Sequence, residues 1–267
     1  MKDSPLISII TIVFNGEKYL QECIDSIKKQ AYRNIEYIII DGKSTDNTLA
    51  IAEQNRDVVN VVVSEKDRGI SDAFNKGIAL AKGELIGILN SDDSYTDNCI
   101  QEVMNFYLAN QRKPGVYYGN IRYFDDDSSH IRISDYSSIW KYMSIYHPSV
   151  FVSKKVYEDI GDFSEDFKYT MDAELIHRAI SKNIPFFHID KCLSNFRTIG
   201  TSDVNYKKTY KEFFKSVSKY NDQGIKTHFW YFWALFKKDI SRTRIGQYFF
   251  KRKHLISSLL SGKIQRG

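Results

Sequence analysis

Two adjacent acidic residues follow the apolar run Leu85 to Leu89, in the segment Asn90-Ser91-Asp92-Asp93. Neighbouring carboxylates repel each other, so such a pair after a buried run is typical of a site where a cation neutralises the charge. Carboxylate oxygens are hard ligands, which prefer Mg²⁺ or Mn²⁺ to softer metals. The segment therefore predicts a divalent-metal site at Asp92 and Asp93.

A further acidic group, Met171-Asp172-Ala173-Glu174, lies at the expected start of a helix. A carboxylate on a second element across a pocket could act as a general base. Glu174 can pair with Arg178 at i+4, which leaves Asp172 as the freer carboxylate. The helix dipole alone also favours an acid in the first turn, and on the residues alone this structural interpretation of Asp172 is the stronger one.

Four short apolar runs alternate with helical patterns in the first 90 residues, which predicts a largely parallel sheet covered on both faces, an α/β fold. These runs are Ile7 to Val13, Ile35 to Ile40, Val58 to Val63 and Leu85 to Leu89, and one of the helices is expected from Ile70 to Ala81. Later strands are expected near Val116 to Tyr118, Ser149 to Val152 and Phe186 to Ile189, and helices near Lys154 to Ile160 and Asp172 to Ser181.

Polar residues follow these strands, and in open parallel sheets ligands bind beyond the carboxyl ends of the strands. The first run ends in Phe14-Asn15-Gly16, and the second ends at Asp41. Asn15-Gly16 also fits an ordinary turn, and Ser44 or Asp46 fits a helix cap, which is the favoured interpretation of Asp46.

Two common phosphate-binding motifs are excluded. A P-loop ending in Gly42-Lys43-Ser44 needs a glycine where the chain has Tyr37, and no G-x-G-x-x-G follows the first strand. These absences disfavour a kinase or a dinucleotide-dependent oxidoreductase.

Four segments, in this order and spacing, resemble the family 2 glycosyltransferases, over roughly residues 6 to 205. The resemblance implies a GT-A fold, an inverting reaction, a nucleotide-sugar donor and a divalent cation, Mn²⁺ or Mg²⁺. It also implies that Asp92 binds the metal, with Asp93 as a helper. The segments are Ser8 to Asn15, Asp41 to Thr48, Asp67 to Gly77 and Asn90 to Asp93.

The resemblance implies a donor pocket in which Asp41 reads the base, with UDP favoured over GDP or dTDP. Many relatives carry a second acid where this chain has Gly42, and often another aspartate near Asn90 and Ser91. Two residues on the third helix, Asp72 and Asn75, either line the pocket or bond a neighbouring loop. The full donor set is Ile12, Phe14, Asn15, Asp41, Asp72, Asn75, Asn90, Ser91 and Asp92.

The resemblance also implies that Asp172 is the base of a single displacement that inverts the anomeric carbon, although Met171 stands where relatives often have glutamate. Three residues are expected to contact the acceptor or the diphosphate: His147, Glu174 and Arg197. A lone histidine is more often structural, whereas Arg197 lies in a segment that resembles a family loop and could offset diphosphate charge.

The net charge of +5 is unevenly distributed: residues 1–206 carry −7, and residues 207–267 carry 15 basic and 3 acidic side chains, a net +12. Aromatic residues accompany these cations, at Phe229 to Trp233 and Tyr248 to Phe250. This combination favours contact with an anionic membrane surface. A helical pair packed on the catalytic domain is the main alternative, and nucleic acid is not expected.

We therefore expect a catalytic domain over residues 1–206, with a donor-binding half to about 115 and an acceptor-binding half from 116, followed by a basic aromatic helical extension over 207–267. Three dispersed cysteines, no signal peptide and no run of about 20 apolar residues favour a cytoplasmic protein, peripheral on the inner leaflet. The expected acceptor is a glycan or lipid-linked sugar of polysaccharide or surface-glycan assembly. The alternatives are a nucleotidyltransferase and an inactive binding module.

Overall fold

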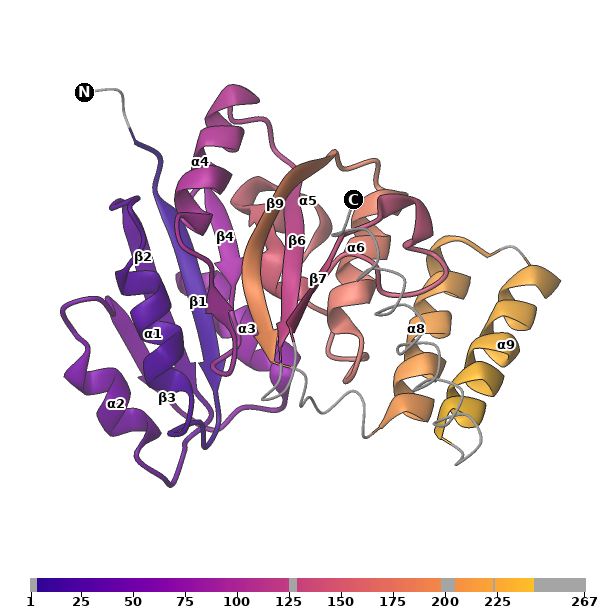
Figure 1. Ribbon diagram of the computed structural model, residues 1–267, viewed down its shortest axis with the longest axis horizontal. Helices are drawn as coiled ribbons and strands as arrows, with labels where there is room; N and C mark the ends of the chain where they lie inside the picture. The colour runs from indigo at the N-terminus through magenta and orange to yellow at the C-terminus, as the bar shows by residue number, and fades with distance from the viewer. Residues whose placement is uncertain (1–3, 125–128, 198–204, 223, 243–267) are drawn as a thin grey trace, which may run out of the picture.

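The computed structural model describes residues 4–124, 129–197, 205–222 and 224–242 (Figure 1). In these residues nine strands form one sheet, in the order β3-β2-β1-β4-β8-β6-β9-β5, with β7 paired to β6. The first four strands are parallel, so their carboxyl ends meet at one edge. They are β1 (Ile7–Val13), β2 (Ile35–Asp41), β3 (Val61–Ser64) and β4 (Leu85–Ile88).

The rest of the sheet mixes directions. β8 runs antiparallel to both β4 and β6, whereas β6 and β9 are parallel and share a bulge at Asn120. The short strand β5 closes the other end of the sheet against β9. These strands are β5 (Ser94–Tyr95), β6 (Val116–Phe124), β7 (Ser129–Arg132), β8 (Val150–Ser153) and β9 (Phe186–Arg197).

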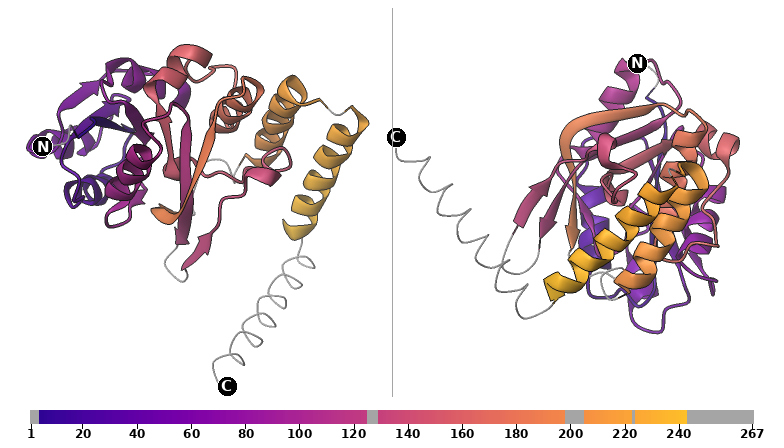
Figure 2. Two further views of the ribbon diagram at one scale, coloured as in Figure 1. Left: turned by 90° about the horizontal axis from the view of Figure 1, so that it is seen from above. Right: turned by 90° about the vertical axis from the view of Figure 1, so that its right-hand side faces the viewer.

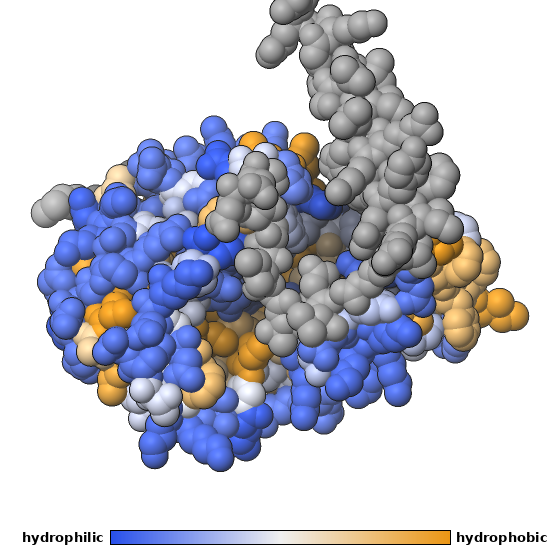
Figure 3. Space-filling view, turned by 60° about the horizontal axis from the view of Figure 1, so that its bottom comes forward, coloured by the Kyte–Doolittle hydropathy of each residue, from blue (hydrophilic) through white to orange (hydrophobic). Residues whose placement is uncertain are grey.

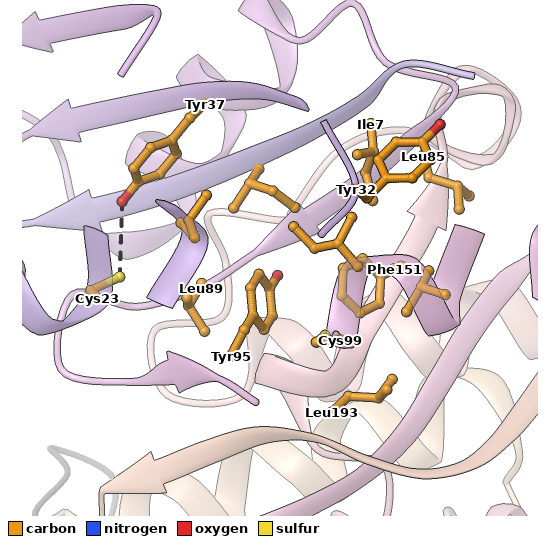
Figure 4. Close-up of a cluster of buried hydrophobic side chains, with 14 of the residues drawn as sticks. Ile7, Cys23, Tyr32, Tyr37, Leu85, Leu89, Tyr95, Cys99, Phe151 and Leu193 are labelled. Carbon is orange, nitrogen blue, oxygen red and sulfur yellow. Dashed lines mark hydrogen bonds between the residues drawn. The ribbon is translucent and has the colours of Figure 1, made fainter. Parts of the chain in front are cut away.

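Helices cover both faces of the sheet, as predicted for an α/β fold. One hydrophobic cluster joins the sheet to α1 (Leu20–Lys28), α2 (Thr48–Gln54) and α4 (Cys99–Ala109), and Figure 4 shows its centre around Phe151 and Tyr95. The second cluster joins the opposite face to α3 (Ile70–Leu80), α5 (Lys154–Ile160) and α6 (Met171–Ser181). Alternate residues of β1 feed the two clusters, because successive side chains of a strand point to opposite faces.

Two further helices follow the sheet: α8 (Tyr206–Tyr220) and α9 (Ile225–Arg242). Figures 1 and 2 show α8 beside α6, with α9 on the far side of α8. Phe213, Phe214 and Val217 of α8 are buried against Ala173 of α6. In the described part of the chain, no helix is long and apolar enough to cross a membrane.

Several boundaries differ from the sequence prediction. β3 starts at Val61 rather than at Val58, because the backbone N–H groups of Val58 and Val59 bond back to Asn55 in a turn. β6 and β9 run well past Tyr118 and Ile189, through polar residues that break the apolar pattern. The helix α4 and the strands β5 and β7 were not among the expected elements.

Candidate active site

The loops after β1 and β2 hold each other in place at the carboxyl edge of the sheet. The Asn15 backbone N–H donates to Ser44 Oγ at 2.8 Å, and Asn15 Oδ1 accepts from the Thr45 N–H at 2.9 Å. Asn15 has a left-handed backbone, with φ of 49°, which asparagine tolerates better than most residues. Asp46 accepts from the Thr48 backbone N–H at 3.0 Å in the turn before α2, whereas Asn47 occupies the N-cap position that was expected for Asp46.

Asp41, the predicted base reader, is completely buried. Both of its carboxylate oxygens accept hydrogen bonds, from Ser44 and from Ser64 Oγ. Phe14 is exposed beside Gly42, where a Cβ would lie 2.6 Å from an Asp67 oxygen. The edge therefore presents an aromatic ring and backbone, with Asp41 beneath them as a support, while Ile12 is partly buried on the α3 side.

Asp72 and Asn75 of α3 both have protein partners. The buried Asp72 pairs with Arg68 at 2.6 Å and with Lys76 at 3.3 Å, which lowers its pKa against the effect of burial. Asn75 exchanges two hydrogen bonds of 2.9 Å with the backbone of Phe163. Of the two interpretations of this pair, bonding to a neighbouring loop describes Asn75.

The two adjacent aspartates after β4 lie in different surroundings. Asp93 is buried, and its carboxylate accepts from the Arg197 backbone N–H at 3.1 Å and, at 3.5 Å, from Asn90 Nδ2. Burial and the charge of Asp92 raise the pKa of Asp93 well above its usual range. Asp92 is half-buried, and no other described side chain donates to its carboxylate; burial raises its pKa, and Arg197 opposes this. Ser91 lies beside Gly16.

Arg197, at the end of β9, packs on the loop that carries these aspartates. Its guanidinium lies between the rings of Tyr19 and Phe124, 4.2 and 4.5 Å from their centroids. It also pairs with Glu22 of α1 at 2.9 Å, and its Nε reaches the Asp92 carbonyl oxygen at 3.4 Å. The cation therefore stands directly beside the candidate metal ligand.

Asp172, in the first turn of α6, lines a small cavity with His147 and with Ile88 at the end of β4. Burial raises the pKa of Asp172 to about 6, against one backbone hydrogen bond from Ala173. His147 Nε2 is buried without a hydrogen-bond partner among the described residues, and burial lowers the pKa of the ring to about 4. The cavity thus joins the predicted base, a neutral imidazole and the strand that leads to Asp92.

Glu174 lies away from this cavity. It is buried and pairs with Arg178 at 2.9 Å, as predicted, and it accepts from Tyr220 of α8 at 2.6 Å. Its neighbour in the helix, His177, bonds Ser216 of α8 at 2.8 Å. This face of α6 is therefore held by α8, whereas Asp172 lies on the face that lines the cavity together with Leu175 and Ile176.

A family model described as "Glycosyl transferase family 2" matches residues 8–164, more than half of the chain. The chain belongs to this family. The match covers Asp41, Asp72 and both aspartates after β4, but it ends before Asp172, so the family membership alone does not assign the base.

Two curated relatives of this glycosyltransferase show the range of similarity. The chain is 38% identical over 128 residues to "Glycosyltransferase GlyG" of Streptococcus pneumoniae, which covers 46% of the chain and 41% of that protein. It is 29% identical over 231 residues to an uncharacterized glycosyltransferase of Rickettsia prowazekii, which covers 82% of the chain and 70% of that protein. The chain thus spans less than half of the length of the pneumococcal relative.

Solved structures share the fold. S. aureus TarS 1-349 in complex with UDP-GlcNAc has a TM-score of 0.65 at 18% identity, over 90% of this chain and 74% of that chain. The mannosyltransferase PcManGT from Pyrobaculum calidifontis, in complex with GDP-Man and Mn²⁺, has a TM-score of 0.63 at 16% identity, over 82% and 64%. The predicted GT-A type of α/β fold is confirmed.

The residues at this edge of the sheet would fit a divalent cation that takes most of its ligands from elsewhere than the protein. Among residues 4–124, 129–197, 205–222 and 224–242, no group of three or more His, Cys, Asp or Glu side chains is placed to hold a metal. Mg²⁺-type sites usually combine one or two carboxylates with substrate phosphates rather than a full protein cage. The carboxylate of Asp92 is half-buried and accepts no hydrogen bond from the described side chains, which suits that arrangement.

Two pairings near the site were not predicted. Arg197 pairs with Glu22, which is on α1, and lies over the ring of Tyr19, just before α1. These residues are 175 and 178 positions away from Arg197 in the chain. Arg68 pairs with Glu165 at 2.7 Å, which joins the loop before α3 to the loop before α6. Both pairings join residues that are distant in sequence, and no local pattern marks them.

Proposed function

We propose that this glycosyltransferase moves a sugar from a UDP-sugar to a hydroxyl group of a glycan or lipid-linked acceptor, with inversion at the anomeric carbon. One observation carries the proposal: each of the two acidic groups has one carboxylate held by the protein and one left open. Asp93 and Glu174 are each bonded to other residues of the protein. Asp92, after β4, and Asp172, beside the cavity, remain available.

Asp172 acts as the base in this proposal. Its carboxylate takes the proton from the acceptor hydroxyl while the oxygen attacks the anomeric carbon, and the bond from that carbon to the diphosphate breaks. The nucleoside diphosphate leaves with the bonding electrons. A pKa of about 6 leaves Asp172 largely ionised at neutral pH, yet more basic than an ordinary aspartate.

The other site residues bind and orient. Asp92, with Asp93 as the second candidate, would hold Mn²⁺ or Mg²⁺, which supplies positive charge to the leaving diphosphate. His147 is neutral at neutral pH, so it would contact the acceptor through a hydrogen bond rather than offset diphosphate charge. Arg197 keeps a cation beside the diphosphate position.

The donor pocket is proposed at the carboxyl edge of β1, β2 and β4. There, the Phe14 ring is exposed for the base, with Asn15 and Ser91 near the loops and Asp41 as their support. Relatives by fold bind UDP-GlcNAc and GDP-Man, which supports a nucleotide-sugar donor for this chain.

The proposed division of the chain follows the sequence analysis: a donor-binding half to about residue 115, an acceptor-binding half over 116–206 and an extension from 207. We propose a role in polysaccharide or surface-glycan biosynthesis, on the cytoplasmic face of the membrane. The excess of basic residues beyond Tyr206 supports this location.

The test is a product assay of purified protein with nucleotide-sugars, Mn²⁺ and a panel of glycan and lipid-linked acceptors. The expected result is release of a nucleoside diphosphate and a glycosylated acceptor, in which the new linkage has the anomeric configuration opposite to that of the donor. Release of pyrophosphate would indicate a nucleotidyltransferase instead. Donor binding by calorimetry without turnover of any acceptor would indicate a binding module.

A further inference from the structure

The helix α9 has an apolar face that points away from the protein. Its inner face packs on α8, where Tyr231 contacts Phe214 with ring centroids 5.3 Å apart. The opposite face carries large apolar side chains at positions i, i+4, i+7, i+11 and i+15, which lie on one side of a helix. These residues, called the outer face here, are Ile225 (89% exposed), Phe229 (61%), Phe232 (65%), Phe236 (55%) and Ile240 (44%).

The rings along this side form a continuous surface. Trp233, itself 40% exposed, stacks on Phe229 and on Phe236, with centroids 6.5 and 5.9 Å apart. Lys237 Nζ lies 5.0 Å from the Trp233 ring, and Lys226 is exposed at the other end of the helix. Figure 3 shows hydrophobic residues gathered at the α9 end of the molecule.

A row of exposed aromatic rings on a soluble surface marks an interaction site, because isolated apolar residues are common but contiguous apolar patches are not. The surrounding charge selects the partner. Residues 207–242 carry nine basic and three acidic side chains, a net +6, so a second copy docked face to face would bring like charges together, since a two-fold contact joins the same patch on both subunits. An anionic lipid surface complements the same charge.

We propose that the outer face of α9 is a membrane-docking surface, with the helix lying flat in the headgroup region of an anionic bilayer. Tryptophan and phenylalanine enter the boundary between headgroups and acyl chains, and the flanking lysines meet anionic lipid. The described helix has 18 residues, about 27 Å at the usual rise, and it lies along the surface rather than across it.

Docking through α9 also orients the catalytic helix. α9 packs on α8, and α8 is joined to α6 through Tyr220 and Glu174 and through Ser216 and His177. The path from the membrane to Asp172 is thus a series of helices in contact, α9 on α8 and α8 on α6. The inference that docking orients the catalytic helix rests on the proposed function, whereas the inference that α9 binds a membrane does not.

The test measures binding of the full chain to vesicles by co-sedimentation, without donor or acceptor. The vesicles are phosphatidylcholine alone or with 30% phosphatidylglycerol. The variant Phe229→Ser/Phe232→Ser/Phe236→Ser should bind anionic vesicles at least about tenfold more weakly than the wild type. The matched control, Leu108→Ser/Ile131→Ser/Ile133→Ser, removes equally exposed apolar side chains elsewhere and should bind as the wild type does.

A second measurement reports depth. Brominated lipids should quench Trp233 fluorescence, and the Trp233→Phe variant should lose most of the quenching that the wild type shows. Asp172→Asn should bind vesicles normally, so a failure of the catalytic proposal would leave this result intact.

Three results would overturn the docking proposal: wild-type chain that stays in solution with anionic vesicles, equal binding by the triple outer-face variant, or a stable dimer in solution that the same variant converts to monomer. Circular dichroism of both triple variants confirms that the substitutions leave the fold intact.

Discussion

Asp92 and Asp172 share a property that their acidic neighbours lack, because no other described side chain holds their carboxylates. Burial of a carboxylate that has no side-chain partner raises the free energy of its ionised form. The pKa values of Asp92 and Asp172 are raised for this reason. Such a cost persists in a protein when a ligand or a reaction uses the group. Asp93 shares the raised pKa, so what distinguishes Asp92 and Asp172 from the other two acids is that no described side chain donates a hydrogen bond to them.

Replacing Asp172 with asparagine should stop transfer while donor binding is retained. The amide cannot take a proton, and loss of a general base typically lowers kcat by about 10² to 10⁴-fold. In the wild type, activity should fall as the pH drops through about 6, because protonation of Asp172 removes the base. A pH–rate profile of kcat and calorimetry of UDP-sugar binding check both; wild-type turnover in the variant contradicts the assignment.

The same substitution should stabilise the fold at neutral pH. The folded-state pKa of Asp172, about 6, lies above the ordinary value of about 4, so the folded state holds the proton more tightly and loses stability as the pH rises from 4 to 6. Above pH 6, the free energy of unfolding of Asp172→Asn should therefore be roughly 2 kcal/mol higher than that of the wild type. Urea unfolding at pH 4 and 7.5 measures this, and a difference at pH 4 as large as that at pH 7.5 would refute it.

The two aspartates after β4 should respond differently to substitution. Asp92→Ala should abolish metal-dependent donor binding with little effect on stability, since none of the described side chains donates a hydrogen bond to its carboxylate. Asp93→Ala should cost about 1–3 kcal/mol of stability, because the Arg197 N–H and Asn90 lose their acceptor. Calorimetry with Mn²⁺ and thermal unfolding separate these effects, and the reverse assignment follows if Asp93→Ala is the stable variant that loses metal dependence.

At the scale of elements, α8 holds the catalytic helix from outside. Glu212 Oε2 accepts from the backbone N–H groups of Lys168 and Tyr169, at 2.9 and 2.7 Å, directly before α6 begins. These are donors in the turn that precedes the helix, where no intrahelical acceptor is available. The position of Asp172 therefore depends on a side chain 40 residues further along the chain.

Glu212→Ala should lower stability by about 1–2 kcal/mol and lower kcat, while the KM for the donor stays near the wild-type value. The effect on kcat follows because a small displacement of a base is costly to the reaction. Glu212→Gln keeps a carbonyl acceptor and should restore most of both. Glu158→Ala, an exposed acid on α5, serves as the control in urea unfolding and steady-state assays. Wild-type kinetics in Glu212→Ala would exclude a role of Glu212 in positioning α6.

The elements differ in how far the sequence predicts them. β1, β2 and β4 are short runs of mostly apolar residues, and their bounds agree with the prediction to within a residue. β9 continues from Ile189 to Arg197 through Asp190 and Lys191, so its length depends on pairing with β6 and not on an apolar pattern. For the same reason the sequence places Arg197 in a loop, while the structure places it at a strand end beside Asp92.

At the site, the direction in which a side chain points likewise limits what the sequence can predict. The sequence identifies Glu174 and Asn75 as polar residues on the right elements, but their partners, Tyr220 and the Phe163 backbone, lie 46 and 88 positions away. Spacing along one helix predicts the Glu174–Arg178 pair, because both residues share a helix face. It does not predict which face meets α8, since that depends on tertiary packing.

At the scale of the whole molecule, the charge balance changes sign near Tyr206, where α8 begins. The expected extension begins with α8, yet Phe213, Phe214 and Val217 are buried in contact with α6. The two alternatives from the sequence therefore fall on different helices. Packing on the catalytic domain describes α8, and the exposed aromatic face belongs to α9.

Two truncations should separate these roles. Ending the chain at Tyr206 exposes the α6 face and removes the partners of Glu174 and His177. Burial of a large apolar side chain contributes about 1.5–3 kcal/mol, and a domain of this kind has about 5–15 kcal/mol in total, so the loss of three such residues should abolish cooperative unfolding. Truncation at Tyr206 is thus a poor test of membrane binding.

Ending the chain at Asp222 keeps α8 and removes α9 with its outer face. The cost should be modest, because α9 packs on α8 mainly through Tyr231 against Phe214, and most of its large apolar side chains are exposed. This shorter protein should unfold cooperatively, a few degrees below the full chain, and retain transfer to a detergent-soluble acceptor while losing vesicle binding. Thermal scans and vesicle co-sedimentation of both truncated proteins test the role of α8 in stability and the role of α9 in vesicle binding. If the protein ending at Tyr206 were as stable as the full chain, α8 would not belong to the catalytic fold, and the link from α9 to Asp172 would fail with it.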